Sequence, residues 1–206
     1  STPLLATLVD ELDIAASLYA KAAARHISLG EWLCRPESSL ARFRPNGRPQ
    51  GSFRDGTVIK PIVEDARYDL DQVVVLEGLR PQDLSQADLK AQFGAELAAY
   101  ADAYGMQTPE EKHRCWRLNY RDEVPFHLDS VPSVPATPET VLALRLEEVI
   151  EPWATRAGAI TDDRHPQYQR GCADWLTSNP RGFARWFEAR AALGIQEMVA
   201  KGMRAS

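Results

Sequence analysis

The sequence predicts an α+β domain in which helices flank a small sheet, mixed or mostly antiparallel. Stretches with apolar residues at three- and four-residue steps alternate with short segments rich in β-branched residues, which is typical of helices and strands in one chain. The 206 residues are 44% hydrophobic, which is enough for one sizeable core. Their net charge of -5 lacks the basic surplus of a protein that coats nucleic acid.

A long helix over residues 1–33 is the first predicted element, and it would form the spine of the domain. Thr2-Pro3 is a typical helix start. The apolar residues that recur at helical steps are Leu4, Leu5, Leu8, Leu12, Ala15, Leu18 and Tyr19.

Residues 35–68 contain the glycines and prolines that are typical of irregular structure. We expect a loop over residues 35–50, because this stretch holds three prolines and an Asn-Gly pair. Residues 51–68 are expected to be a loop with one helical turn.

The remaining segments predict the sheet and its covering helices. Strands are expected over residues 69–76, 113–120, 124–131 and 158–161, with residues 120–123 as the turn between the second and third. Helices are expected over residues 83–104, 138–156 and 181–203, the last with an apolar face of Phe183, Trp186 and Phe187. We therefore expect residues 51–135 to carry the catalytic sheet and residues 175–206 to be a helical segment of the same domain.

Cysteine usage and hydropathy favour a cytoplasmic protein. Cys34, Cys115 and Cys172 are odd in number and widely spaced, so they form no disulfide framework. No run of about 18 apolar residues exists, so we expect no membrane span. The acidic N-terminal stretch does not resemble a signal peptide.

Asp69 and Asp71 are two residues apart at the start of a predicted strand. Side chains alternate across a strand, so both carboxylates should lie on one face. Such a pair is common at a solvated strand end. It also fits Mg²⁺, which prefers carboxylate oxygens together with substrate phosphates.

Two further segments complete a candidate site. A Gly51-Ser52 turn lets backbone amides approach an anion closely, although an ordinary surface turn has the same appearance. Asp129 is a single carboxylate in a later predicted strand. If that strand neighbours the one with Asp69 and Asp71, the three carboxylates can hold two metal ions.

The order of these segments resembles that of polymerase-β-like nucleotidyltransferases. The residues within these segments are similar to those of the CD-NTases of bacterial CBASS anti-phage defence. The CD-NTases are relatives of cyclic GMP–AMP synthase and include the DncV-like enzymes. The matching segments are QGSFRDGTVIKP at 50–61, YDLD at 68–71, FHLDSVP at 126–132 and SNPRGFARWF at 178–187. Two positions depart from the pattern, Asp55 and Gln72, and neither removes a metal ligand.

The resemblance implies a synthase that joins nucleoside triphosphates into a cyclic di- or trinucleotide and releases pyrophosphate. It implies Asp69, Asp71 and Asp129 as ligands of two Mg²⁺ ions, with Mn²⁺ as a substitute. It further implies that the triphosphate binds at Gly51 and Ser52, with Ser178 and Asn179 near the nucleotide. The product would activate a separate effector, and a regulatory protein partner is compatible with this family. We expect no DNA activator, because the sequence has no zinc ribbon or broad basic face.

Two alternatives stay open. The chain could be another polymerase-β-like nucleotidyltransferase, one that modifies a protein, RNA or small molecule. Those enzymes have a shorter gap between Gly-Ser and Asp-x-Asp than residues 53–68 provide here. The other alternative is a non-catalytic nucleotide-binding fragment, since the helical C-terminal half of the family is expected to lie outside these 206 residues.

Overall fold

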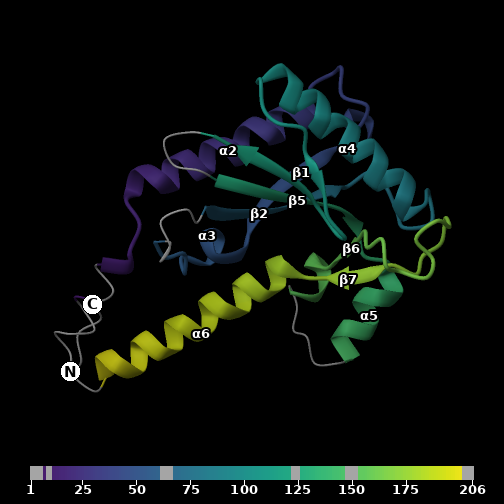
Figure 1. The fold of residues 1–206 in the computed structure, drawn as a ribbon. Coiled ribbons are helices and arrows are strands. Elements are labelled where there is room, and N and C mark those ends of the chain that lie inside the picture. Colours follow the sequence, from purple (N-terminus) through teal and green to yellow (C-terminus); the bar gives the residue numbers. More distant parts are fainter. Residues whose placement is uncertain (1–6, 8–10, 61–66, 122–125, 147–152, 201–206) are drawn as a thin grey trace.

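A computed structural model of the chain describes residues 7, 11–60, 67–121, 126–146 and 153–200 (Figure 1). One mixed sheet of seven strands lies at its centre, in the order β1-β2-β5-β4-β3, with β6 paired to β5 and β7 paired to β6. Strands β2 and β5 pair in parallel and every other described pair is antiparallel. The predicted α+β class with a mixed sheet is confirmed.

The strands are β1 (Pro45–Gln50), β2 (Tyr68–Leu76), β3 (Glu110–Glu111), β4 (Trp116–Tyr120), β5 (Phe126–Pro135), β6 (Gly158–Ile160) and β7 (Leu176–Ser178). The helices are α2 (Ala16–Cys34), α3 (Gly51–Asp55), α4 (Gln86–Ala103), α5 (Pro138–Leu146) and α6 (Pro180–Ala200). Two single 3-10 turns, η1 (Ala41–Phe43) and η2 (Ala154–Arg156), complete the described elements.

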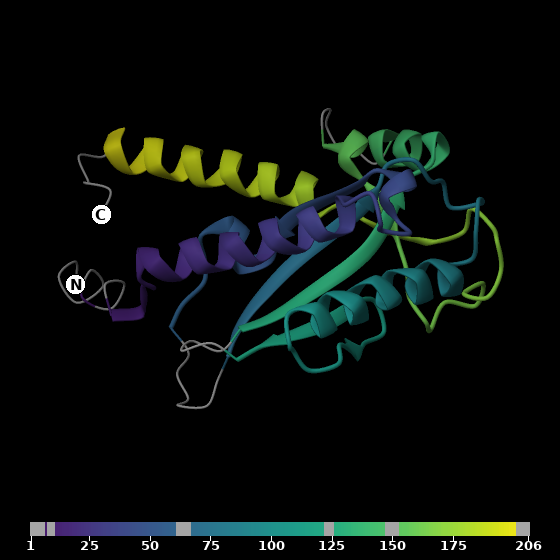
Figure 2. The same cartoon turned by 90° about the horizontal axis from the view of Figure 1, so that it is seen from above.

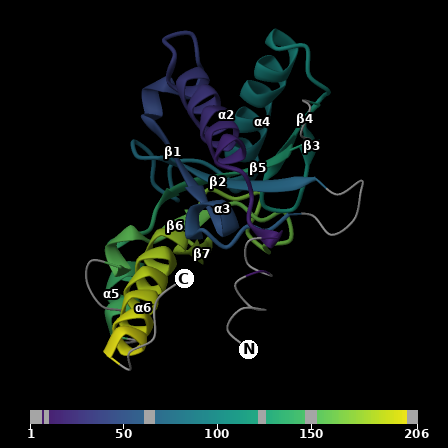
Figure 3. The same ribbon diagram turned by 90° about the vertical axis from the view of Figure 1, so that its left-hand side faces the viewer.

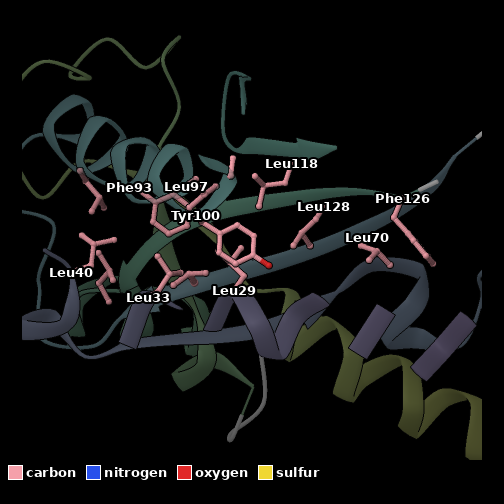
Figure 4. Close-up of a cluster of buried hydrophobic side chains, with 14 of the residues drawn as sticks. Leu29, Leu33, Leu40, Leu70, Phe93, Leu97, Tyr100, Leu118, Phe126 and Leu128 are labelled. Carbon is pink, nitrogen blue, oxygen red and sulfur yellow. The ribbon is translucent and has the colours of Figure 1, made fainter. Parts of the chain in front are cut away.

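Helices cover the two faces of the sheet unequally. Figures 2 and 3 show α2 and α4 lying across one face, while α3, α5 and α6 lie on the other side. The core fills the space between the sheet and the α2–α4 layer, where leucines from both helices meet Leu70, Leu118 and Leu128 of the strands (Figure 4). The even-numbered positions Leu70 to Leu76 of β2 therefore face the core, and Asp69 and Asp71 face the opposite side.

One of these buried β2 positions is Gln72, which departs from the family pattern. Its side chain is fully buried. It contacts His26 Nδ1 of α2 at 2.9 Å and donates to Ser130 Oγ of β5 at 3.1 Å. These partners satisfy the buried amide, so this polar residue fits beneath α2.

The helix predicted over residues 1–33 is not continuous. Residues 13–15 are not helical, and α2 begins only at Ala16, after an extended Ala15. Asp13 Oδ1 accepts a hydrogen bond from the N–H of Ile14, a local bond that competes with helix formation. Lys60 donates hydrogen bonds to the carbonyl of Glu11 through Nζ and to the carbonyl of Leu12 through its backbone N–H. In a continuous helix these carbonyls would instead accept hydrogen bonds from the following turn.

The prediction of a loop over residues 35–50 is wrong for residues 45–50, because these form strand β1. This strand lies at the edge of the sheet and, among the described strands, pairs with β2 alone. Proline lacks the N–H that a central strand needs, but an edge strand tolerates it on its free side. Pro45 and Pro49 therefore interrupt no ladder.

Other boundaries also shift. The sheet extends on both sides of the predicted 51–135 region, from Pro45 to β7. The predicted helical segment 175–206 begins with strand β7. Of the predicted helix 138–156, residues 138–146 are helical as α5 and residues 154–156 form η2, while residues 147–152 lie outside the described part. Strands of two and three residues, β3 and β7, are too short to show a hydropathy pattern. Residues 122 and 123 of the predicted turn at 120–123 also lie outside the described residues.

The predicted face of α6 is not buried. Phe183 and Trp186 are 55% and 40% exposed and contact each other. The other predicted elements are confirmed as β2, α3, α4, β4, β5 and β6 within a few residues. No helix in the described part of the chain has both the length and the apolar character needed to cross a bilayer.

Candidate active site

The parallel pairing of β2 with β5 brings the three predicted aspartates together. Its register places Asp71 opposite Asp129 and Asp69 opposite His127. Carboxylate oxygens of Asp69, Asp71 and Asp129 lie within 4.8 Å of one another. We call this cluster the acidic corner. Its three oxygen-donor side chains match the ligand preference of Mg²⁺ and Mn²⁺.

The proximity of these carboxylates perturbs their ionisation. Burial, then repulsion from Asp69 and Asp129, raises the pKa of Asp71 to about 6, although Arg117 opposes the shift. Burial and the charge of Asp129 also raise the pKa of Asp69. Like charges held together favour a proton or a cation. A divalent ion would remove this repulsion, so the residues present fit a metal site.

Arg117 is a member of the site that the sequence reading missed. Its Nε and Nη2 donate to the two oxygens of Asp129 at 2.6 and 2.8 Å, and Nη2 lies 3.7 Å from Asp69 Oδ1. The antiparallel pairing of β4 with β5 places Arg117 opposite Asp129. The predicted hairpin turn at residues 120–123 would instead have placed it opposite Phe126, so a register error of three residues concealed the contact.

Gly51 must be glycine at this position for two reasons. Its φ of +68° lies in the left-handed region that other residues rarely adopt. A Cβ on Gly51 would also overlap Asp71 Oδ2 and lie 3.2 Å from Asp71 Cγ. The turn that begins α3, with Ser52 next to Gly51, therefore lies directly against the acidic corner. This position suits the predicted contact with a triphosphate.

Ser178 ends strand β7, and Asn179 directly precedes helix α6. Asn179 Nδ2 donates to Trp153 O at 2.7 Å and its Oδ1 accepts from Gly182 N–H at 2.8 Å. Asn179 thus caps the start of α6. Ser178 lines a cavity of about 320 Å³ together with Val73, Val75 and other residues of the aspartate face. Their predicted nucleotide contacts stay predictions.

A chain of hydrogen bonds fixes His127 beside Asp69. Asn119 Nδ2 donates to Glu110 Oε1 at 2.7 Å, so the other amide atom, Oδ1, is the acceptor that lies 2.6 Å from His127 Nδ1. Nδ1 therefore carries the proton in this network. Burial, then Arg117 and Arg67, lowers the pKa of His127. The neutral ring leaves Nε2 as a hydrogen-bond acceptor on the face that carries the aspartates.

Comparisons with known proteins agree with this fold. Residues 45–132 match the family model of the Cyclic GMP-AMP synthase DncV-like nucleotidyltransferase domain. A c-di-GMP synthase of Roseivirga ehrenbergii is 26% identical over 199 residues, which are 95% of this chain and 46% of that protein. The cyclic dinucleotide synthase CdnG of Bradyrhizobium diazoefficiens is 27% identical over 189 residues, 91% of this chain and 39% of that protein.

Solved structures extend the comparison. The structure of the Bradyrhizobium diazoefficiens CD-NTase CdnG in complex with GTP aligns with a TM-score of 0.64 and 25% identity, over 98% of this chain and 53% of that one. Vibrio cholerae DncV cyclic AMP-GMP synthase aligns with a TM-score of 0.58 at 12% identity, over 88% of this chain and 58% of that one, and shows the shared fold alone. This chain spans less than half the length of the two curated relatives.

The fold is similar to that of the CD-NTase CdnG, and the acidic corner supplies the oxygen ligands that a metal-dependent nucleotidyltransferase needs. Residues 45–132 match the DncV-like nucleotidyltransferase domain, and most of the chain is similar to the two cyclic dinucleotide synthases.

Proposed function

We propose that this chain contributes the catalytic site of a synthase that joins nucleoside triphosphates into a cyclic di- or trinucleotide second messenger of anti-phage signalling. The observation that carries the proposal is the acidic corner, three carboxylates within 4.8 Å on the strands of a CD-NTase fold. The relatives named as cyclic dinucleotide synthases, and the GTP bound by CdnG, support nucleoside triphosphates as substrates.

In this proposal Asp69, Asp71 and Asp129 bind two Mg²⁺ ions, which Mn²⁺ can replace. The ions supply charge neutralisation at the phosphates. Gly51 and Ser52 hold the triphosphate against Asp71, and Ser178 and Asn179 lie near the nucleotide.

The reaction forms and breaks one bond in each transfer step. The 2′- or 3′-hydroxyl oxygen of one nucleotide forms a bond to the α-phosphorus of another, and the bond from that phosphorus to the bridging oxygen breaks. Pyrophosphate leaves with the bonding electrons, and a carboxylate of the acidic corner accepts the hydroxyl proton. The chain's contribution is to position the nucleotides and to compensate their charge.

The proposed setting is the cytoplasm, where nucleoside triphosphates are available. The product would signal to a separate effector, and no DNA activator is proposed. The E. coli MS115-1 CdnC, a relative in fold, was solved as a complex with HORMA-deltaN. A regulatory protein partner is therefore compatible with the proposal.

The deciding experiment incubates the protein with radiolabelled ATP, GTP, CTP and UTP plus Mg²⁺ or Mn²⁺. We expect a phosphatase-resistant product, lost in the Asp69→Asn/Asp71→Asn variant and kept in a matched Asp102→Asn/Asp174→Asn control. The assay should include any longer native form of the chain. If no form yields a product, the synthase proposal is wrong. If the Asp69→Asn/Asp71→Asn variant stays active, the assignment of the metal ligands is wrong.

A further inference from the structure

Six arginines gather around two adjoining cavities on the side of the sheet that carries the aspartates. The cavities measure about 310 and 320 Å³ and share Arg156, Pro180 and Arg181 in their walls. We call this region the arginine cleft. Its arginines come from five elements or their caps, and they are Arg44, Arg48, Arg54, Arg156, Arg181 and Arg185.

Few carboxylates compensate this charge. Glu188 Oε1 accepts from Arg54 at 2.6 Å and Glu188 Oε2 accepts from Arg185 at 3.1 Å, so one acid serves two arginines. Arg48, Arg156 and Arg181 make no ion pair within the described part of the chain. Arg156 Nε is buried and has no hydrogen-bond partner there. A buried donor without a partner destabilises the fold unless a ligand satisfies it.

Mutual repulsion among these guanidinium groups is visible at Arg181. Burial, then the charges of Arg156 and Arg48, lowers the pKa of Arg181, and Glu77 only partly opposes them. Arg44 adds backbone strain, because its φ of 53° makes it the one described non-glycine residue in the left-handed region. Strain and unpaired charge at one place are typical of a binding site.

The arginine cleft is separate from the acidic corner and lies beside it. Arg48 of β1 pairs with Val73 of β2, two residues beyond Asp71 on the same face, a separation of about 7 Å along the strand. From there the cleft extends away from Asp69, past Val75 and under the first turn of α6. Asp69, Asp71 and Asp129 do not line either of the two cavities.

We infer that the arginine cleft binds an oligophosphate chain. Planar guanidinium groups pair with phosphate oxygens through two hydrogen bonds each, and several around one cavity select a ligand that carries several negative charges. A monoanion would leave most of the arginines unpaired. The oligophosphate belongs either to a nucleoside triphosphate or to a separate phosphorylated ligand. This inference does not rest on the proposed synthase activity.

Calorimetry with inorganic tripolyphosphate tests the inference on the 206-residue chain. EDTA is present throughout, so that no metal bridges phosphate to the aspartates. We expect saturable binding that weakens about tenfold or more in Arg156→Gln/Arg181→Gln, since two charge-assisted contacts are lost. Arg121→Gln/Arg170→Gln removes two exposed arginines outside the cleft and should bind as the unaltered chain does. Thermal unfolding monitors whether each variant folds, and Arg48→Gln, an exposed edge-strand change, should weaken binding without affecting folding.

Two further measurements test whether the cleft is independent of the aspartates and which molecule carries the oligophosphate. Asp69→Asn/Asp71→Asn should bind tripolyphosphate at least as tightly as the unaltered chain, because the cleft does not use these aspartates and the variant removes two negative charges beside it. If GTP displaces tripolyphosphate and guanosine does not, the cleft binds the triphosphate of a nucleotide. If GTP does not displace tripolyphosphate, the cleft binds a separate phosphorylated ligand. Both results support the arginine cleft as an oligophosphate site. Absence of binding, or equal loss in the Arg121→Gln/Arg170→Gln control, overturns the inference. The synthase assay can succeed in either case, so failures of the two proposals are distinguishable.

Discussion

The acidic corner and the arginine cleft lie on one side of the same sheet. Each holds like charges close together, negative in the acidic corner and positive in the arginine cleft. Three carboxylates crowd within 4.8 Å in the first, and six arginines share two nearby carboxylates in the second. A net charge of -5 for the whole chain conceals this separation. Each cluster is unfavourable alone, so the acidic corner favours divalent cations and the arginine cleft favours phosphate. The predictions that follow test whether the two regions differ as charge dictates.

The acidic corner should lose metal affinity in mild acid. Asp71 has a raised pKa of about 6, so a proton competes with the metal below that pH and is absent above it. Apparent Mn²⁺ affinity should therefore be level from pH 8 to 7 and fall about tenfold per pH unit below 6. Calorimetry across this range measures it. Affinity that stays constant down to pH 5 would contradict the crowded arrangement.

Gly51→Ala should disrupt the contact between the Gly-Ser turn and the acidic corner. The new Cβ overlaps Asp71 and the left-handed backbone is strained, so we expect a loss of about 1–3 kcal/mol of unfolding free energy. Chemical denaturation measures this change.

Gly30→Ala is the matched control for Gly51→Ala. It lies in α2, where a Cβ would meet nothing within 4 Å, and it should stabilise the protein by about 0.4–1 kcal/mol. Equal effects at Gly30 and Gly51 would show that the close approach to Asp71 is unimportant.

Arg117→Gln should sharpen the contrast by making the acidic corner more negative. Removing the guanidinium frees both oxygens of Asp129 and removes the charge that opposes the raised pKa of Asp71. We expect Mn²⁺ to bind about fivefold more tightly at pH 8, equivalent to about 1 kcal/mol. Weaker binding would mean that Arg117 orients Asp129 for the metal instead of competing with it.

The bridge between α3 and α6 should contribute least. Arg54 and Glu188 are 33% and 42% exposed, and exposed ion pairs contribute less than about 1 kcal/mol. A double-mutant cycle of Arg54→Gln and Glu188→Gln on thermal unfolding measures the coupling. A coupling well above that value would mean that this bridge, and not packing, holds α6 against α3.

The sequence predicts the acidic corner better than the arginine cleft, and the reason is distance along the chain. Strand alternation alone placed Asp69 and Asp71 on one face, and the ordered motifs pointed to Asp129. The pairing of β2 with β5 that joins them is a tertiary contact that only the structure supplies. Arg117 was hidden by a three-residue error in hairpin register.

The arginine cleft draws Arg48 and Arg54 from one basic stretch, but Arg156 and Arg181 come from segments more than 100 residues later. No local pattern joins such residues. The same limit applies to β1, because prolines that indicate a loop also suit an edge strand, and only the sheet order distinguishes the two.

The central claim is that the acidic corner is a two-metal site, and a count of bound Mn²⁺ tests it most directly. Electron paramagnetic resonance of Mn²⁺ at pH 8, with GTP present, should show two ions per chain. Loss of an outer-shell partner typically weakens metal binding by about 10–100-fold. In Asp71→Asn, which loses a direct ligand, the affinity for Mn²⁺ should fall further than that, while Asp102→Asn should match the unaltered chain. Two ions retained in Asp71→Asn, or none bound by the unaltered chain, would contradict the account.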